Sequence, residues 1–159
     1  MKKIILFAFV FTSVISYGQK IDSINCSKIN KEVDEFTDKI TYRVYITPSS
    51  NQTFIKSVQD GITNYYLSIY IPETDINRGT GVIILLKNGI KINKPDAEVD
   101  YALIGDQFYA KTFIKLTNND IELLKQSGIA KYKLYVSTGD ITEYSDLCKD
   151  LFNCLIQSK

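Results

Sequence analysis

Residues 60–71, DGITNYYLSIYI, carry the clearest structural pattern in the chain. It begins with Asp60-Gly61, a pair typical of the mirror-image two-residue turn of a β-hairpin. Behind this turn, apolar and polar positions alternate with period two, as in a half-buried strand. One face carries Tyr65, Leu67, Ile69 and Ile71, and the other carries Tyr66, Ser68 and Tyr70. The stretch therefore predicts a hairpin whose second strand has one apolar face and one face rich in tyrosine.

The segments on both sides extend this pattern into a series of strands. Asn88-Gly89 and Gly105-Asp106 are two further two-residue turn signals. The segment from Val82 to Leu86 is apolar throughout, which predicts a central strand covered on both faces. Two more alternating rows predict strands, namely Ile40, Tyr42, Val44 and Ile46, and Phe108, Ala110 and Ile114. Strands joined by such short turns predict an antiparallel meander.

Two helices are predicted towards the C-terminus. Thr117 and Asp120 have the spacing of a capping box, and Gly128 is predicted as the left-handed residue that ends this helix. A strand is expected over residues 131–136. The closing helix, about residues 142–156, has an apolar stripe formed by Tyr144, Leu147, Cys148, Leu151 and Leu155. Residues 26–36 fit either a helical turn or a strand followed by a turn, and we favour the strand.

The whole pattern predicts a single α+β domain. It should contain a curved antiparallel β-meander of about seven to nine strands, with two helices near the C-terminus. No repeat, low-complexity tract or linker interrupts residues 19–159, so one exported domain is expected there. The alternative fold is a closed up-and-down barrel with a cavity, which resembles small-ligand carriers such as lipocalins. The chain lacks tryptophan, the residue that marks the first strand of those carriers.

The first eighteen residues have the layout of a secretory signal peptide. Lys2-Lys3 forms a positive start, residues 4–15 are apolar, and small residues precede a cleavage site after Gly18. About twelve apolar residues are too few for a permanent bilayer span, which needs about 20. We therefore expect cleavage of residues 1–18 and export of the mature chain to the periplasm or the extracellular space, without stable membrane insertion.

The charge of the mature chain is nearly balanced. The full sequence has 19 basic and 18 acidic side chains, and loss of Lys2 and Lys3 leaves 17 against 18. Such balance gives no electrostatic footprint for nucleic acid or for an anionic membrane surface. We therefore expect no nucleic-acid partner.

Three cysteines, Cys26, Cys148 and Cys154, would reach an oxidising compartment after export. Cys148 and Cys154 fall in the predicted closing helix, where their six-residue separation gives a rise of about 9 Å, too long for a disulfide. Cys26 is therefore one partner of any disulfide. We favour Cys26–Cys154, because Cys148 lies in the apolar stripe and fits a buried free thiol, and Cys26–Cys148 stays open as the alternative.

The absence of histidine limits the catalytic chemistry. It excludes Ser-His-Asp and Cys-His catalysis and histidine zinc sites, and no cofactor is predicted. Asp96, Glu98 and Asp100 alternate along one predicted strand, so they share a face with a spacing of about 6.6 Å. They could hold a hard cation such as calcium or form an acid and base pair. The simpler interpretation is a solvated strand face.

Tyrosine is abundant, with 11 in the chain. Five of them fall on strand faces opposite the most apolar rows, namely Tyr45, Tyr66, Tyr70, Tyr109 and Tyr135. On an open sheet they could line a shallow groove for a glycan or another protein, because tyrosine combines a large ring with a polar tip. If the sheet closes, or if the helices cover this face, the same rings are ordinary packing of a second face.

Four segments carry a resemblance to a group of bacterial proteins. They are the leader of residues 2–19, VDEFT at 33–37, KNGIK at 87–91 and LTNNDI at 116–121. With them the chain resembles the small exported proteins that are plentiful in Bacteroidota. Asp22-Ser23-Ile24 also resembles the acceptor triplet of protein O-glycosylation in that group, so Ser23 is a candidate glycosylation site. The resemblance implies an envelope or secreted location and implies no activity.

These observations favour a non-catalytic exported module that binds or interacts with an envelope protein or a glycan. The excluded catalytic sets and the tyrosine face both support this hypothesis. A carrier of small apolar ligands is the second hypothesis, and it requires an internal cavity. A hydrolase that uses two carboxylates is the third, and it requires Asp96, Glu98 or Asp100 to meet another acid in a cleft.

Overall fold

The structure is a computed structural model of the chain, and it describes residues 26–49, 51–74 and 78–159. The predicted signal peptide, its predicted cleavage site and Ser23 lie outside the described residues. The strands are β1 (Asn30–Val33), β2 (Ile40–Tyr45), β3 (Gln52–Gln59), β4 (Ile62–Glu73), β5 (Gly79–Leu86), β6 (Lys91–Ile104), β7 (Gln107–Lys115), β8 (Ile129–Leu134) and β9 (Ser137–Asp140). Two helices, α1 (Asn118–Gln126) and α2 (Ser145–Gln157), and two short 3₁₀ turns, η1 (Cys26–Lys28) and η2 (Thr142–Tyr144), complete the described part.

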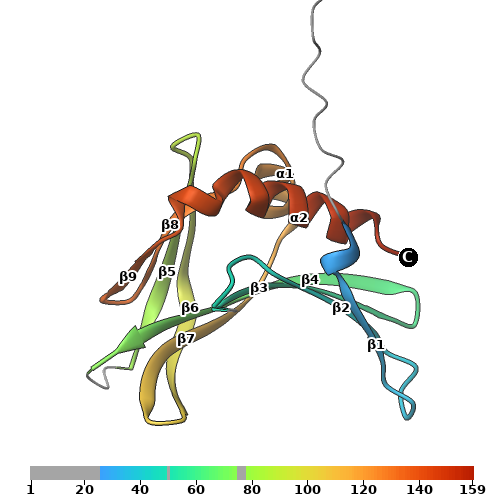
Figure 1. Cartoon of the computed structure of the whole chain (residues 1–159), viewed down its shortest axis with the longest axis horizontal. Coiled ribbons are helices and arrows are strands. Elements are labelled where there is room, and N and C mark those ends of the chain that lie inside the picture. The colour runs from blue at the N-terminus through green and yellow to red at the C-terminus, as the bar shows by residue number, and fades with distance from the viewer. Residues whose placement is uncertain (1–25, 50, 75–77) are drawn as a thin grey trace, which may run out of the picture.

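The nine described strands form one antiparallel sheet in the order β1-β2-β3-β4-β7-β6-β5-β8-β9. The sheet is arched, and both helices lie on its concave side (Figure 1). The edge strands β1 and β9 do not pair with each other, so the sheet is open. The predicted α+β fold, a curved antiparallel sheet with two helices near the C-terminus, is confirmed. The closed barrel is wrong.

The long strand β6 belongs to two parts of the sheet. Its first residues pair with β5, and residues 100–104 pair with β7. Within the pairing with β5, residues 95–97 bulge opposite Gly81, which has a φ of +104°, and Glu98 and Val99 then pair with β5 again. We call β1, β2, β3, β4 and β7 with the end of β6 the first half-sheet. The start of β6 with β5, β8 and β9 is the second half-sheet.

Helix α2 covers the inner face of the arch, and this explains why no barrel cavity forms there. Its apolar residues recur at the spacing of one helical face and are fully buried, namely Cys148, Leu151, Phe152 and Leu155. The Phe152 ring lies 4.6 Å from the Phe54 ring, measured between centroids. Burying side chains of this size stabilises the fold by about 1.5–3 kcal/mol each.

The buried Lys56 on β3 stabilises the C-terminal end of α2. Its ammonium group donates to the carbonyl oxygen of Ser158 at 2.6 Å and to that of Ile156 at 3.3 Å. It also lies 5.3 Å from the centroid of the Tyr42 ring. A cation at this end of a helix satisfies carbonyl groups that have no partner within the helix.

The predicted disulfide Cys26–Cys154 is present, with the two Cα atoms 5.5 Å apart. It ties η1 to the last turns of α2. Cys148 is a buried free thiol, as predicted, and burial raises its pKa to about 12. A thiol with such a pKa is protonated at neutral pH and is not a nucleophile.

The predicted capping box of the first helix is also present. The Thr117 N–H donates to Asp120 Oδ2 at 2.7 Å, and the Asp120 N–H donates to Thr117 Oγ1 at 3.3 Å. Lys94 of β6 donates to the same carboxylate at 2.5 Å, and the two side chains are only 20% and 6% exposed. Burial alone would raise the pKa of Asp120, but the Lys94 ammonium and the Thr117 hydrogen bonds hold this pKa below its usual value.

We expect Asp120→Ala to lower the free energy of unfolding by about 3 kcal/mol, because it removes the cap and leaves Lys94 without its partner. The contribution of Asp120 is complete above its unfolded-state pKa of about 3.9 and is lost as the pH falls through the lower folded value. The difference between wild type and variant should therefore shrink below about pH 4.

Urea titrations at a series of pH values measure this difference. Glu122→Ala on the same helix is the control, because Glu122 makes only an exposed ion pair with Lys125. Its expected cost is below about 0.5 kcal/mol. Equal costs for the two variants would contradict the role of Asp120.

Glycine is needed at position 128 for a reason other than the predicted left-handed conformation. Positive φ angles among the described glycines occur at 61, 81, 89 and 105, and not at 128. Helix α1 ends instead on Ser127 in an extended conformation, with φ −148°. A Cβ atom on Gly128 would lie 1.6 Å from the carbonyl oxygen of Ser145. The prediction that Gly128 ends the helix in a left-handed conformation is therefore wrong. Position 128 requires glycine because its backbone lies against the backbone of Ser145.

The strand predicted at 131–136 ends earlier and has a partner that the sequence did not reveal. Strand β8 stops at Leu134, Tyr135-Val136 forms the turn, and β9 pairs back on β8. Tyr135 has a φ of +53°, so it lies in this turn and not on a strand face. A Cβ atom on Gly79 would lie 2.6 Å from the Tyr135 ring, so this ring packs directly over Gly79. The placement of Tyr135 on the tyrosine face is wrong.

Strand β5 is covered on one face only, which corrects a second prediction. Val82, Ile84 and Leu86 are buried on the inner face. On the outer face, Ile83 is 38% exposed and Leu85 is half-buried. This apolar outer face lies in the second half-sheet.

Candidate functional site

Three of the predicted tyrosines lie close together on the outer face of the first half-sheet. Tyr66 and Tyr70 are on β4, and Tyr109 is on the neighbouring strand β7. The Tyr70 and Tyr109 rings meet edge to face, with centroids 6.4 Å apart. The Tyr66 ring stacks on Phe113, with centroids 4.8 Å apart and planes at 20°. We call Tyr66, Tyr70, Tyr109 and Phe113 the aromatic patch.

Phe113 is the patch residue that sequence reasoning missed. It is 60% exposed and lies opposite Ser68 on β4. The signal was present in the sequence, because Tyr109, Lys111 and Phe113 alternate with the inward row of β7. A phenylalanine that is exposed on a sheet face and stacked on a second ring is more typical of a binding surface than of an ordinary solvated surface.

Tyr45 lies on the same outer face but lines another hollow. It is 43% exposed on β2 and is opposite Thr53 of β3. A hollow of about 520 Å³ lies beside it, lined by Lys28, Asn30, Tyr45, Ile46, Thr47, Pro48, Tyr144 and Leu147. Tyr45 is therefore not a member of the aromatic patch.

Two of the three predicted acidic residues lie beside the aromatic patch. Glu98 and Asp100 on β6 line a hollow of about 260 Å³, which we call the patch hollow. Asp96 is exposed and does not line it. The other residues of the patch hollow are Ser68, Tyr70, Lys111, Thr112 and Phe113. Aromatic rings, a hydroxyl, carboxylates and an ammonium group thus meet within one shallow depression.

The electrostatics of Asp100 do not fit a metal site or an acid catalyst. Asp100 lies 3.2 Å from Arg78 and 3.9 Å from Lys111, measured between charged atoms. The Tyr101 backbone N–H, followed by these two cations, holds the pKa of Asp100 below its usual value. A general acid needs the opposite shift. Across residues 26–49, 51–74 and 78–159, no group of three or more His, Cys, Asp or Glu side chains could hold a metal ion.

A larger cleft adjoins the patch hollow through Tyr70, which lines both. It has a volume of about 590 Å³ and lies between the loop before β3, the end of β4 and strand β9. We call it the central cleft. Thr47 Oγ1 donates to Gln52 Oε1 at 2.8 Å, and Gln52 Nε2 donates to the Tyr132 hydroxyl. Burial raises the pKa of Tyr132 to about 12, so this hydroxyl keeps its proton.

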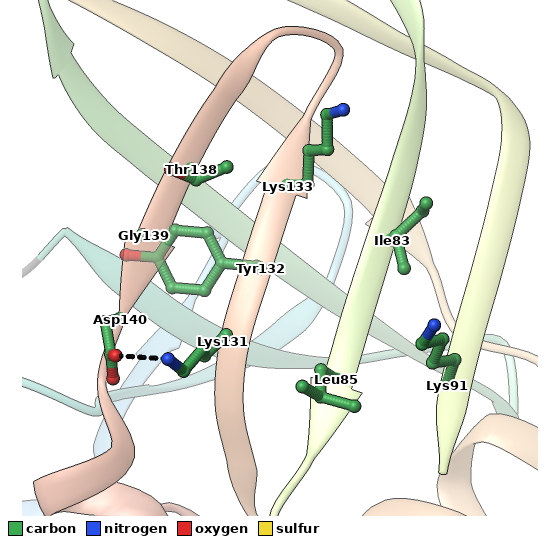
Figure 2. A pocket seen from close by; sticks show the side chains of 9 residues that line it. All are labelled: Ile83, Leu85, Lys91, Lys131, Tyr132, Lys133, Thr138, Gly139 and Asp140. Atoms are coloured by element: carbon green, nitrogen blue, oxygen red, sulfur yellow. Dashed lines mark ion pairs between the residues drawn. The ribbon is translucent and has the colours of Figure 1, made fainter. Parts of the chain in front are cut away.

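A fourth depression, of about 420 Å³, lies on the outer face of the second half-sheet (Figure 2). We call it the lysine groove. Leu85 is paired with Lys91 on one side and Lys131 on the other, and Ile83 is paired with Lys133. The groove is completed by Tyr132 and the β9 residues Thr138, Gly139 and Asp140. Three lysines thus surround two apolar side chains.

One of these lysines has an acidic partner. Lys131 lies 2.9 Å from Asp140. Asp140 also accepts hydrogen bonds from the hydroxyl and the backbone N–H of Thr142, at 2.7 and 2.9 Å. These Thr142 bonds, and then Lys131, hold the pKa of Asp140 well below its usual value. Asp140 is therefore fixed in place as an anion.

The described part of the chain contains no helix that is both long and apolar enough to cross a membrane. Comparison of the chain with protein-family models, with curated proteins and with solved structures finds no match in any of the three.

Proposed function

We propose that the protein is an exported, non-catalytic module that binds a glycan through the aromatic patch and the patch hollow. The observation that carries this proposal is the stack of the exposed Phe113 on the half-buried Tyr66, beside a hollow lined by two carboxylates and a lysine. These side chains come from β4, β6 and β7.

The chemistry of the patch suits a sugar. The apolar faces of sugar rings pack on aromatic rings, and Phe113, which is 60% exposed, offers such a surface to solvent beside Tyr66. Sugar hydroxyl groups donate to carboxylates, and Asp100 stays ionised because its pKa is lowered. Lys111 can donate to ring and hydroxyl oxygens. An open depression of this kind orients a ligand without excluding water, which favours binding over catalysis.

The central cleft gives a polymer room to continue past the patch hollow. Tyr70 lines both depressions, so a chain bound at Phe113 can extend past Tyr70 towards Asn51. The Asn51 amide there can offer further hydrogen bonds. We therefore expect the ligand to be an oligosaccharide of several units.

Export is supported by the leader pattern and by the Cys26–Cys154 disulfide, because structural disulfides persist in oxidising compartments. The proposed setting is the bacterial envelope or the exterior.

The test is affinity electrophoresis and co-sedimentation with purified peptidoglycan and a panel of soluble glucans, mannans and xylans. We expect at least one glycan to bind, and Phe113→Ala and Tyr70→Ala each to weaken binding at least about 10-fold, the factor that corresponds to about 1.4 kcal/mol. Leu103→Ala is the matched control, because Leu103 is an exposed apolar residue outside the patch hollow.

Equal binding by wild type and the two patch variants would place the glycan elsewhere and contradict the proposal. Failure of the whole panel, together with capture of one envelope protein that Phe113→Ala abolishes, would make the patch a protein interface instead.

A further inference from the structure

We propose that the lysine groove is a binding site for a small anionic amphiphile, a single apolar chain that ends in a carboxylate or phosphate. This site lies in the second half-sheet. It shares Tyr132 and three β9 residues with the central cleft but no residue with the patch hollow, and neither proposal depends on the other.

The floor of the groove is apolar although it faces outward. Ile83 and Leu85 lie on the outer face of β5, with β6 and β8 on either side. The unbroken apolar run of this strand has the composition of a strand that is buried on both faces. Only the inner face is covered within the described residues, so Ile83 and Leu85 offer an uncovered apolar surface.

The walls of the groove are positively charged. Lys91 and Lys133 have no acidic partner among the described residues, whereas Lys131 is paired with Asp140. Figure 2 shows Lys91 and Lys131 on opposite sides of Leu85, with Lys133 farther along β8. Two ammonium groups therefore border the apolar floor with their charge uncompensated. An anionic head group complements this charge, and an apolar tail complements the floor.

The size and shape of the groove favour a small molecule over a macromolecule. Its volume of about 420 Å³ lies within the range of pockets for small ligands. Its walls are strands, and the Tyr132 ring extends towards Gly139 of β9 (Figure 2). A Cβ atom on Gly139 would lie 2.2 Å from that ring, so the wall is closely packed. A preformed groove loses little conformational entropy when a ligand binds.

The test uses four probes on the full protein to separate the contribution of the anionic head group to binding from that of the apolar tail. The probes are octyl phosphate, octanol, octylammonium and inorganic phosphate. Each is titrated as a monomer, and backbone amide shifts are followed by NMR. We expect octyl phosphate to bind at least about 10-fold more tightly than the other three, with shifts centred on Ile83, Leu85 and Lys133. Octanoate should behave like octyl phosphate.

Two variants test the residues. Lys133→Glu should weaken octyl phosphate binding at least about 10-fold, and Ile83→Ser should do so without changing the response to inorganic phosphate. Lys115→Glu is the control, because Lys115 is an exposed strand lysine outside the groove. Lys133→Glu should leave glycan binding unchanged, so failure of one proposal is distinguishable from failure of the other.

Three outcomes would overturn the proposal. They are equal binding of octanol and octyl phosphate, equal weakening by Lys133→Glu and Lys115→Glu, and binding to anionic phospholipid vesicles without binding to monomeric octyl phosphate. The last result would make the lysine groove part of a membrane-facing surface.

Discussion

Replacing Gly128 by alanine is expected to lower the free energy of unfolding by at least about 3 kcal/mol or to prevent folding. The added Cβ would lie 1.6 Å from the Ser145 carbonyl oxygen and 2.6 Å from its carbon, and both atoms belong to the backbone. Hydrogen bonds hold the backbone around both Gly128 and Ser145 in place. The Ser145 hydroxyl donates to the Ile129 carbonyl at 2.6 Å, and the Lys87 N–H donates to the Gly128 carbonyl at 2.9 Å.

Chemical denaturation followed by circular dichroism measures this loss. Gly89→Ala separates steric overlap from backbone strain, because Gly89 has a φ of +86° and open space around it. Its expected cost is about 1–2 kcal/mol. If Gly128→Ala is no more destabilising than Gly89→Ala, the close approach of Gly128 and Ser145 is not required for folding.

Loss of the disulfide is expected to have the second large effect. The double variant Cys26→Ser with Cys154→Ser should lose about 4–5 kcal/mol of stability, because the bond closes a loop between residues 128 positions apart. All four residues of β1 are exposed, so pairing with β2 and the nearby disulfide hold this edge strand. We therefore expect β1 amides to lose hydrogen-exchange protection first.

Reduction of the wild-type protein provides the matched comparison, since it should reproduce the stability of the double variant. Thiol titration of the denatured, unreduced chain should find one free thiol, that of Cys148. Three free thiols, or a stability change below about 1 kcal/mol, would contradict the proposed contribution.

The features that could be predicted from the sequence are those that depend on local pattern. Alternation along residues 65–71 placed the inward row of β4 correctly, because one face of that strand is buried in the core. The Thr117–Asp120 capping box was predictable because it involves residues three positions apart. The pairing of Cys26 with Cys154 followed from the reach of a disulfide and the apolar surroundings of Cys148.

The missed features depend on contacts between distant segments. Strand β9 reads Ser-Thr-Gly-Asp, a composition typical of turns, and it is a strand only because β8 pairs with it. Lys56 breaks the apolar row of β3, since its partners are carbonyl groups of α2 a hundred residues away. The lysine groove arises from the sheet order, which brings Lys131 and Lys133 beside Ile83 and Leu85.

The order of the strands separates neighbouring from distant pairings. The pairs β1–β2, β2–β3, β3–β4, β5–β6, β6–β7 and β8–β9 join consecutive strands, whereas β4–β7 and β5–β8 join segments far apart in the chain. Distant pairings require larger loops to close and form late in folding. The aromatic patch lies across the paired strands β4 and β7, and the lysine groove lies across the paired strands β5 and β8. Each ligand would therefore bind only a chain in which that distant pairing has formed, and it would stabilise the fold by an amount that grows with the ratio of ligand concentration to its dissociation constant.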